Sequence, residues 1–492
     1  MRKLFLLLVV MGLVAIGCTD NGVSDNNPET PNNNPLSQIT CNPNEILYTT
    51  KYGYPIELNN TQGFGGNIVS NTYDNGIGRI TFDYDIITIP DNAFKDCNSM
   101  TYIKLPDGIT HIGEYAFRGC LSLETLYLPD SIADISDNVF QDCTSLVQVT
   151  IPDSVTKIGN YIFKNCTSLT TTTIGKGVTS IGNGAFSGCT SLASIIIGDS
   201  VVNIGDYAFF QCASLTSVII PDGVTSIGKR AFSDCTALAS VIIGDNVVNI
   251  GDYVFSQCTS LRSVIIPNSV TSIGDRAFNG CSGELIIDSN IVNTSYTYYG
   301  DNVYGNDYPS LDGWLSGSKF TKLTIGHSVT SIGKYVFFNC ASLTSVIIPN
   351  NVTSIGRAAF SGCTSLISVI IPDGVTSIEK ETFSGCTSLI RVTIPNSVTS
   401  IGESAFLLCT SLTSIIIPNK VSKIGASVFA SCTSLKDVYC KRITPPRGDG
   451  VMFYNNASDR KIYVPRASVD AYKSASYWSE YSSNIVGYDF ND

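Results

Sequence analysis

The chain has 492 residues, 43% of them apolar, which is enough to bury a sizeable core. Charged residues make up only 14% of the chain, and the formal net charge is −11. This acidic balance argues against nucleic acid or an anionic membrane surface as the main partner.

Residues 1–17 have the pattern of a secretion signal. Arg2 and Lys3 precede an apolar stretch, residues 4–16, that is too short to span a bilayer. The sequence Ala-Ile-Gly-Cys at residues 15–18 resembles a bacterial lipobox, which would make Cys18 the acylated first residue of the mature chain. An uncleaved anchor and an ordinary secretory signal are the alternatives. We therefore expect contact with a membrane through the lipid anchor only.

Two short regions separate this signal from the rest of the chain. Residues 18–40 are rich in Asn and Pro, which predicts a polar tether. Residues 41–79 are predicted to form an N-terminal cap, in which residues 44–48 and 54–58 pair as a hairpin over the first repeat.

Fourteen cysteines then recur at one interval. Within each of two runs, successive cysteines are 23 residues apart. A fixed period of this length is typical of a solenoid, in which every period forms one coil that stacks on the next. The cysteines are Cys97, Cys120, Cys143, Cys166, Cys189, Cys212, Cys235, Cys258 and Cys281, then Cys340, Cys363, Cys386, Cys409 and Cys432.

Each coil repeats the same apolar positions around its cysteine. In all fourteen coils Phe stands three residues before the cysteine and Ile eight before it, and in twelve coils Leu stands three residues after it. Apolar residues six and eight positions after the cysteine, such as Val218 and Ile220, predict a strand that buries alternate residues. The recurring Val-Thr-x-Ile segment predicts a second, shorter strand, and residues 207–209 predict a single helical turn.

The pattern extends beyond the cysteines. Ile80 and Phe82 fit a coil before Cys97. After Cys432, one more coil is indicated by Phe453, Ile462, Val464 and Pro465. Between the two runs, a degenerate coil places Trp314, Gly317, Phe320, Leu323 and Ile325 at the Phe, Cys, Leu, Val and Ile positions.

These limits define the predicted domains. About sixteen coils cover residues 80–465, with an insertion at about residues 288–313. Residues 466–492 are predicted to form a C-terminal cap. A helix is expected at residues 467–481, with Tyr472, Tyr477 and Trp478 closing the last coil.

The coil resembles that of the BspA-like leucine-rich-repeat family, which reads roughly L-x-x-V-x-I-P-x-x-V-T-x-I-G-x-x-A-F-x-x-C. Residues 343–363 read LTSVIIPNNVTSIGRAAFSGC. Residues 462–465, 471–473 and 484–486 are also similar to the C-terminal module of that family. The resemblance implies a β-rich solenoid of leucine-rich-repeat type in a surface-exposed bacterial protein of adhesive or host-interacting character. With the lipid anchor, it implies a location on the bacterial outer membrane.

The repeated cysteines are predicted to form a buried column of free thiols. Equivalent Cβ atoms in adjacent coils lie about 4.8 Å apart, whereas a disulfide needs about 3.8 Å. A buried cysteine behaves as a small apolar residue. Because no Cys-x-x-Cys pair occurs, we expect no metal site. Cys440 fits a core position, whereas the pattern gives Cys41 no place.

The sequence predicts no catalytic residues and no cofactor, and therefore no enzyme. The chain has only two histidines, His111 and His327, which fall at variable positions of their coils. No Ser-His-Asp, Cys-His or metal-binding group can be assembled around them.

The outward side of the longer strand is the first candidate binding site. Positions five and seven after the cysteine are predicted to point outward, and they are mostly Ser and Ile. Four consecutive coils carry the isoleucine, as Ile196, Ile219, Ile242 and Ile265. The strand propensity of isoleucine explains such a row without a partner. An apolar strip is also typical of a surface that binds one.

The insertion is the second candidate. Its Tyr, Ser, Gly, Asn and Asp residues resemble the composition of antibody loops, and tyrosine offers rigid, amphipathic contact area. A loop packed on its own coil is one alternative, and a calcium site among residues 301–312 is another, although no complete calcium-loop pattern is present. The candidate contact residues are Tyr296, Tyr298, Tyr299, Tyr304 and Tyr308.

These features predict a cell-surface lipoprotein that acts as a macromolecule-binding or adhesion module. Its expected partner is a protein or glycan of a host or neighbouring cell, with self-association as a further possibility. The alternative is a structural or self-assembling surface rod without a specific ligand.

Overall fold

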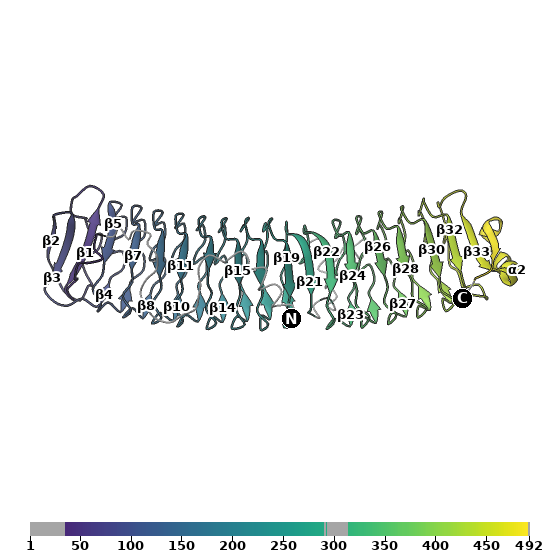
Figure 1. The fold of residues 1–492 in the computed structure, drawn as a ribbon, viewed down its shortest axis with the longest axis horizontal. Coiled ribbons are helices and arrows are strands. Elements are labelled where there is room, and N and C mark those ends of the chain that lie inside the picture. Colours follow the sequence, from purple (N-terminus) through teal and green to yellow (C-terminus); the bar gives the residue numbers. More distant parts are fainter. Residues whose placement is uncertain (1–34, 290–291, 293–312, 491–492) are drawn as a thin grey trace, which may run out of the picture.

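The computed structural model describes residues 35–289, 292 and 313–490. In these residues the chain winds into an elongated rod of stacked coils, with the N-terminal cap at one end and the C-terminal cap at the other (Figure 1). The predicted solenoid of parallel strands is therefore confirmed.

One face of the rod, here called the long-strand face, is formed by the strand that follows each cysteine. Its hydrogen bonds divide it into sheets of eight, eight and four strands, the first of which includes three strands of the N-terminal cap. The strands of this face are β5 (Met100–Lys104), β7 (Thr125–Tyr127), β9 (Gln148–Thr150), β11 (Thr171–Thr173), β13 (Ser194–Ile195), β15 (Ser217–Ile219), β17 (Ser240–Ile242), β19 (Ser263–Ile266), β21 (Ser282–Ile287), β22 (Lys319–Ile325), β24 (Ser345–Ile347), β26 (Ser368–Ile370), β28 (Arg391–Thr393), β30 (Ser414–Ile417), β32 (Asp437–Cys440), β33 (Lys461–Pro465) and β34 (Ile485–Tyr488).

A second face, here called the short-strand face, carries two-residue strands from the Val-Thr-x-Ile segments, as predicted. Each of these strands ends in the isoleucine that stands eight residues before the cysteine, and this isoleucine is buried in nearly every coil. They are β4 (Thr88–Ile89), β6 (His111–Ile112), β8 (Asp134–Ile135), β10 (Lys157–Ile158), β12 (Ser180–Ile181), β14 (Asn203–Ile204), β16 (Ser226–Ile227), β18 (Asn249–Ile250), β20 (Ser272–Ile273), β23 (Ser331–Ile332), β25 (Ser354–Ile355), β27 (Ser377–Ile378), β29 (Ser400–Ile401) and β31 (Lys423–Ile424).

The strands pair in register, position for position. In β15 and β17, for example, Val218 pairs with Val241 and Ile219 pairs with Ile242. Because the period is fixed, residues at the same position of successive coils are neighbours along the rod, and they are often of the same type. Both valines are buried, whereas the side chains on either side of each point outward.

The core contains a column of stacked phenylalanine rings. Along the two runs, neighbouring ring centroids lie 5.0 to 5.6 Å apart with nearly parallel planes. The cysteines form a second column beside it, and nearly all of them are buried. Twelve of the thiols donate a hydrogen bond to the main-chain oxygen of the phenylalanine one coil earlier, at Sγ–O distances of 3.0 to 3.3 Å.

The expected helical turn at residues 207–209 is wrong. Tyr207 and Gln211 both have positive φ, 57° and 59°, which interrupts any right-handed helix. The backbone N–H groups of Tyr207 and Phe209 instead donate to carbonyl oxygens of the next coil. These turns therefore add a ladder of hydrogen bonds between coils.

The N-terminal cap differs from the predicted hairpin. The strand β1 (Glu45–Thr50) lies antiparallel between β3 (Ile77–Phe82) and β5, and β2 (Ile68–Asp74) forms the outer edge. Ile80 and Phe82 are buried as expected, but β1 separates their strand from the first coil.

Residues 54–58 form a loop rather than a strand, and this loop replaces the missing coil before Cys97. Its Glu57 oxygen accepts the hydrogen bond of the Cys97 thiol at 3.2 Å. Cys41, which the repeat pattern did not place, is half-buried in the cap and donates from its thiol to the Glu45 oxygen. Desolvation by burial raises the pKa of Cys41 to about 11.

The degenerate coil lies where it was predicted. Leu323 pairs with Leu285, and Ile325 pairs with Ile287, so β22 stacks directly on β21. Trp314 is buried beside the phenylalanine column, but its ring meets Phe278 edge-on at 6.0 Å.

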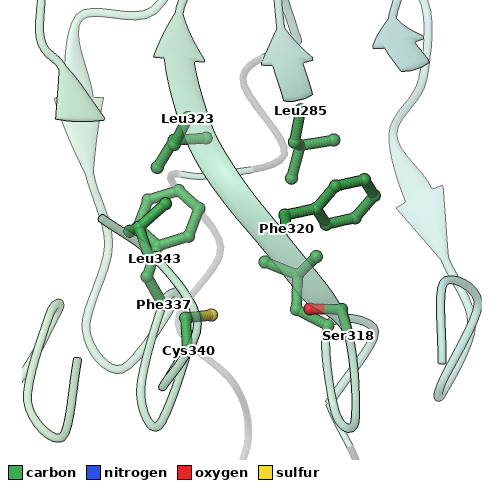
Figure 2. A pocket seen from close by; sticks show the side chains of 8 residues that line it. Leu285, Ser318, Phe320, Leu323, Phe337, Cys340 and Leu343 are labelled. Atoms are coloured by element: carbon green, nitrogen blue, oxygen red, sulfur yellow. The ribbon is translucent and has the colours of Figure 1, made fainter. Parts of the chain in front are cut away.

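The core has a small cavity beside the degenerate coil. A cavity of about 10 Å³, close to the space that one water needs, lies between the degenerate coil and the coil of Cys340. Its lining is mostly apolar (Figure 2): Leu285, Leu315, Ser318, Phe320, Leu323, Phe337, Cys340 and Leu343.

At the C-terminal end, Phe453 continues the phenylalanine column and β33 and β34 continue the long-strand face. The expected helix at 467–481 is instead three short segments: η2 (Arg466–Ser468), α2 (Val469–Ser474) and η3 (Ser479–Asn484). Extended backbone at Ala475 ends α2, and Tyr477 has a φ of 65°. Tyr472 and Trp478 close the last coil, whereas Tyr477 is exposed, contrary to expectation.

Candidate binding face

The long-strand face presents the predicted isoleucine row to solvent. Ile196 is 80% exposed and Ile219 is 48% exposed, whereas Ile242 and Ile265 are partly buried by their neighbours. The row continues through Ile286 and, beyond the degenerate coil, through Ile347, Ile370 and Ile416. The strand alternation that buries Val218 and Val241 is what turns these isoleucines outward.

A parallel row of hydroxyl groups flanks the isoleucines. Ser217, Ser240 and Ser263 pair in register two residues before the isoleucines of the same strands. Around the middle of the first run, the outward positions thus carry short uncharged side chains. Such a face supplies apolar contact with hydroxyl groups beside it.

The structure adds two isoleucines that the sequence reasoning missed. Ile367 and Ile390 stand four positions after their cysteines, and about half of each is exposed. The N–H of Ile390 donates to the oxygen of Ile367 at 2.9 Å, so the two lie in adjacent coils. With Ile347 and Ile370 they form an apolar patch in the second half of the rod. A scan of every outward column, rather than of position seven alone, would have found them.

Aromatic residues end the row near the C-terminal cap. Tyr439 pairs with Ile416 and with Tyr463, and the two tyrosine rings stack at 4.7 Å. Tyr488 meets both rings edge-on at 5.5 Å. Burial raises the pKa of Tyr439 and of Tyr463.

Neither histidine lies in a strand of this face. His111 is in β6 on the short-strand face, where its Nδ1 lies 2.8 Å from Asp134 Oδ2 in the next coil. His327 is exposed in a turn. Within the described residues, no three His, Cys, Asp or Glu side chains are grouped so that they could hold a metal ion.

Several predicted sites fall outside the described residues. These are the lipidation site Cys18, the insertion tyrosines Tyr296, Tyr298, Tyr299, Tyr304 and Tyr308, and the acidic residues considered for calcium. In the part of the chain that the structure describes, no helix is both long enough and apolar enough to cross a membrane.

The chain matches the model of the BspA type leucine rich repeat region over residues 68–193, 179–307 and 313–438, in six copies. No curated protein shows significant similarity to it. It is similar to the crystal structure of a leucine-rich repeat protein from Bacteroides ovatus, with 29% identity and a TM-score of 0.50. That match covers 74% of this chain and 92% of the other.

A leucine rich cell surface protein from Faecalibacterium prausnitzii is 34% identical over 64% of this chain and 87% of its own, with a TM-score of 0.34. The family match and the Bacteroides ovatus structure support a protein-binding or surface role in general terms. They identify no ligand.

Proposed function

Because the chain belongs to the family of BspA type leucine-rich repeat proteins, we propose that it is a surface lipoprotein that binds macromolecules through its long-strand face. It holds this face away from the cell on the rod and on the tether of residues 18–40. The ligand is a protein or glycan of a host or neighbouring cell. Repeat solenoids commonly bind partners on such extended surfaces, and we assign no catalytic step to this one.

The observation that carries the proposal is the exposed isoleucine row. Monomeric proteins rarely expose large contiguous apolar surface, because it lowers solubility and favours association. Here the apolar side chains recur in register over successive strands, so they form a strip rather than isolated contacts. Strand propensity alone does not require isoleucine, since Thr150 and Thr173 occupy the same position in other coils.

A binding screen with matched variants tests this proposal. The full-length protein is passed over immobilised matrix proteins, mucins and glycans. The test variant carries both Ile219→Asp and Ile242→Asp. The control variant carries both Val202→Asp and Val248→Asp, because these valines are exposed at a different position of the coil. We expect only the isoleucine variant to lose binding, while both keep the circular dichroism of the parent. Equal binding by both variants would exclude the isoleucine row as the ligand site.

The lipid anchor is tested separately. Cys18→Ser removes the acylated thiol, so the protein should move from the membrane fraction to the soluble fraction and lose incorporation of labelled fatty acid. Unchanged membrane association without incorporated fatty acid would instead support an uncleaved anchor.

A further inference from the structure

We propose that the partner on the long-strand face is a second copy of this chain, docked face to face and antiparallel, on a neighbouring cell. The twofold axis lies between β21 and β22 and runs along the strand direction. The proposal rests on the proposed function, because it uses the same face, and it names the partner.

The first argument is the symmetry of the apolar residues about this axis. A twofold axis along the strands keeps each residue's position within its strand and exchanges coils at equal distances from the axis. The outward residues that then face each other are Ile286 and Thr324, Ile265 and Ile347, Ile242 and Ile370, Ile219 and Thr393, and Ile196 and Ile416. Three of these five pairs join isoleucine to isoleucine.

The second argument is charge. Glu284 in β21 and Lys322 in β22 are the outward residues next to the axis, and they form an ion pair of 2.9 Å within one chain. Both are partly exposed. In the antiparallel pair, Glu284 of each copy faces Lys322 of the other copy. Arg391 in β28 occupies the same strand position as Glu284 and Lys322. In the antiparallel pair it faces the hydroxyl of Ser217 in β15 of the other copy.

Charge also favours the antiparallel arrangement over a parallel one. A face-to-face pair with parallel rods has its twofold axis along the rod, so each coil faces the same coil of the other copy with its strand direction reversed. Glu284 then faces residues of β21 of the other copy rather than Lys322 in β22. The pairing of opposite charges between the copies is therefore made only in the antiparallel arrangement.

The third argument is size. The ten strands from β13 to β30 span about 45 Å at a spacing of about 4.8 Å, and a strand of three residues such as β15 extends about 10 Å. The area is therefore about 450 Å² for each copy, which is the size of a weak, transient interface.

The positions of the caps indicate that the second copy belongs to a neighbouring cell. The N-terminal and C-terminal caps lie at opposite ends of the rod (Figure 1). Antiparallel pairing therefore places the two N-terminal caps at opposite ends of the complex. Attachment points at opposite ends fit two facing membranes better than a single one.

A charge-exchange experiment tests the pairing. The mass of the full-length protein in mild detergent is measured by light scattering, for the parent and for the variants Glu284→Lys and Lys322→Glu. Each variant alone places like charges opposite each other, so we expect the dissociation constant of the dimer to rise at least about tenfold. In a mixture of the two, Lys at 284 of the first variant faces Glu at 322 of the second, and Lys322 of the first faces Glu284 of the second. Both contacts therefore join opposite charges, so we expect a heterodimer with the parent's affinity.

Recovery on mixing cannot come from the ion pair within one chain, because neither variant regains it. A parent that is monomeric at about 100 μM, variants that dimerise like the parent, or a mixture without recovery would each overturn the proposal. If the protein stays monomeric but binds an immobilised ligand through Ile219 and Ile242, only this inference fails and the proposed function stands. If the substitutions at Ile219 and Ile242 change neither dimerisation nor ligand binding, both fail.

Discussion

The Sγ atom of Cys212 donates a hydrogen bond to the main-chain oxygen of Phe186, 3.3 Å away in the preceding coil. The thiol thus satisfies a carbonyl of the turn that carries the stacked phenylalanine, and it fills the core as a small apolar group. A thiolate could not donate this bond and would be buried without compensation. Burial accordingly raises the pKa of Cys212 well above its ordinary value.

This relationship predicts that the protein loses stability in mild alkali. Burial raises the pKa of Cys143, Cys235 and Cys386 from 9.0 to about 12. Between these values the unfolded chain has released its thiol protons and the folded chain has not, so stability falls as the pH rises. The loss is about 1.4 kcal/mol per pH unit for each such thiol.

Thermal unfolding followed by circular dichroism between pH 7 and about 10.5 measures this loss, and Tm should fall progressively above about pH 9. Cys235→Ala removes one such proton, so its stability should fall less steeply with pH than that of the parent. A Tm that does not change over this range would show that the column thiols do not control the alkaline stability.

The phenylalanine column predicts a large effect from a single truncation. Phe209 stacks on Phe186 at 5.3 Å and on Phe232 at 5.0 Å, and it is fully buried. Phe209→Ala should therefore lower the free energy of unfolding of the coils around it by about 3 to 5 kcal/mol. The adjacent Phe210 is only partly buried, so Phe210→Ala is the matched control with a smaller expected loss.

Denaturant titration combined with native-state hydrogen exchange separates local from global unfolding, because neighbouring coils of a solenoid open semi-independently. Equal losses for the two variants would mean that ring stacking in the column contributes little beyond burial of aromatic surface.

The period made most of the rod predictable. Every internal coil has the same neighbours, so a residue such as Phe209 or Val218 repeats in one environment and its role can be read from its position. The ends have no such repetition. Nothing periodic indicated that β1 would insert antiparallel between β3 and β5, because that pairing is made once and depends on tertiary contacts.

Two features inside the rod were also missed, for different reasons. The positive φ of Tyr207 gives no sequence signal, since tyrosine rarely adopts this conformation and hydrogen bonds to the next coil impose it. The exposed patch around Ile367 and Ile390 was overlooked because these isoleucines occur at this position in only two adjacent coils.

The turn before each cysteine predicts a stabilising substitution. The residue directly before the cysteine has positive φ in every coil of the two runs and is most often Gly, Asn or Asp. Leu408 is the one apolar residue at this position, with a φ of 61° and an exposed side chain. Leu408→Asn should raise the free energy of unfolding by about 0.5 to 1 kcal/mol, because Asn tolerates this conformation better.

Gly385, one coil earlier, provides the converse test. Its φ is 72°, and an added Cβ would lie no closer than 3.6 Å to a neighbouring atom. Gly385→Ala should therefore cost about 1 kcal/mol through backbone conformation alone. Denaturant midpoints of the two variants measure both effects, and a stabilising Gly385→Ala would contradict the conformational argument.

The C-terminal cap predicts that one indole protects the open end of the phenylalanine column. The Trp478 Nε1–H donates to the Pro446 oxygen at 2.8 Å, and the ring packs edge-on against Tyr472 at 4.9 Å and lies 6.0 Å from Phe453. Trp478→Ala removes the cover of the last coil, so the free energy of unfolding of this end should fall by about 3 to 5 kcal/mol. It should also expose strand edges that promote aggregation.

The neighbouring Tyr477 is exposed and does not cover the column, so Tyr477→Ala is the control and should leave solubility unchanged. Hydrogen exchange of β33 and β34, together with light scattering on heating, distinguishes the two variants. If Trp478→Ala leaves both measurements at the level of the control, β34 and the short helices close the rod without the indole. If it opens only these last strands while the coils around Phe209 keep their protection, the end of the solenoid unfolds as a separate unit.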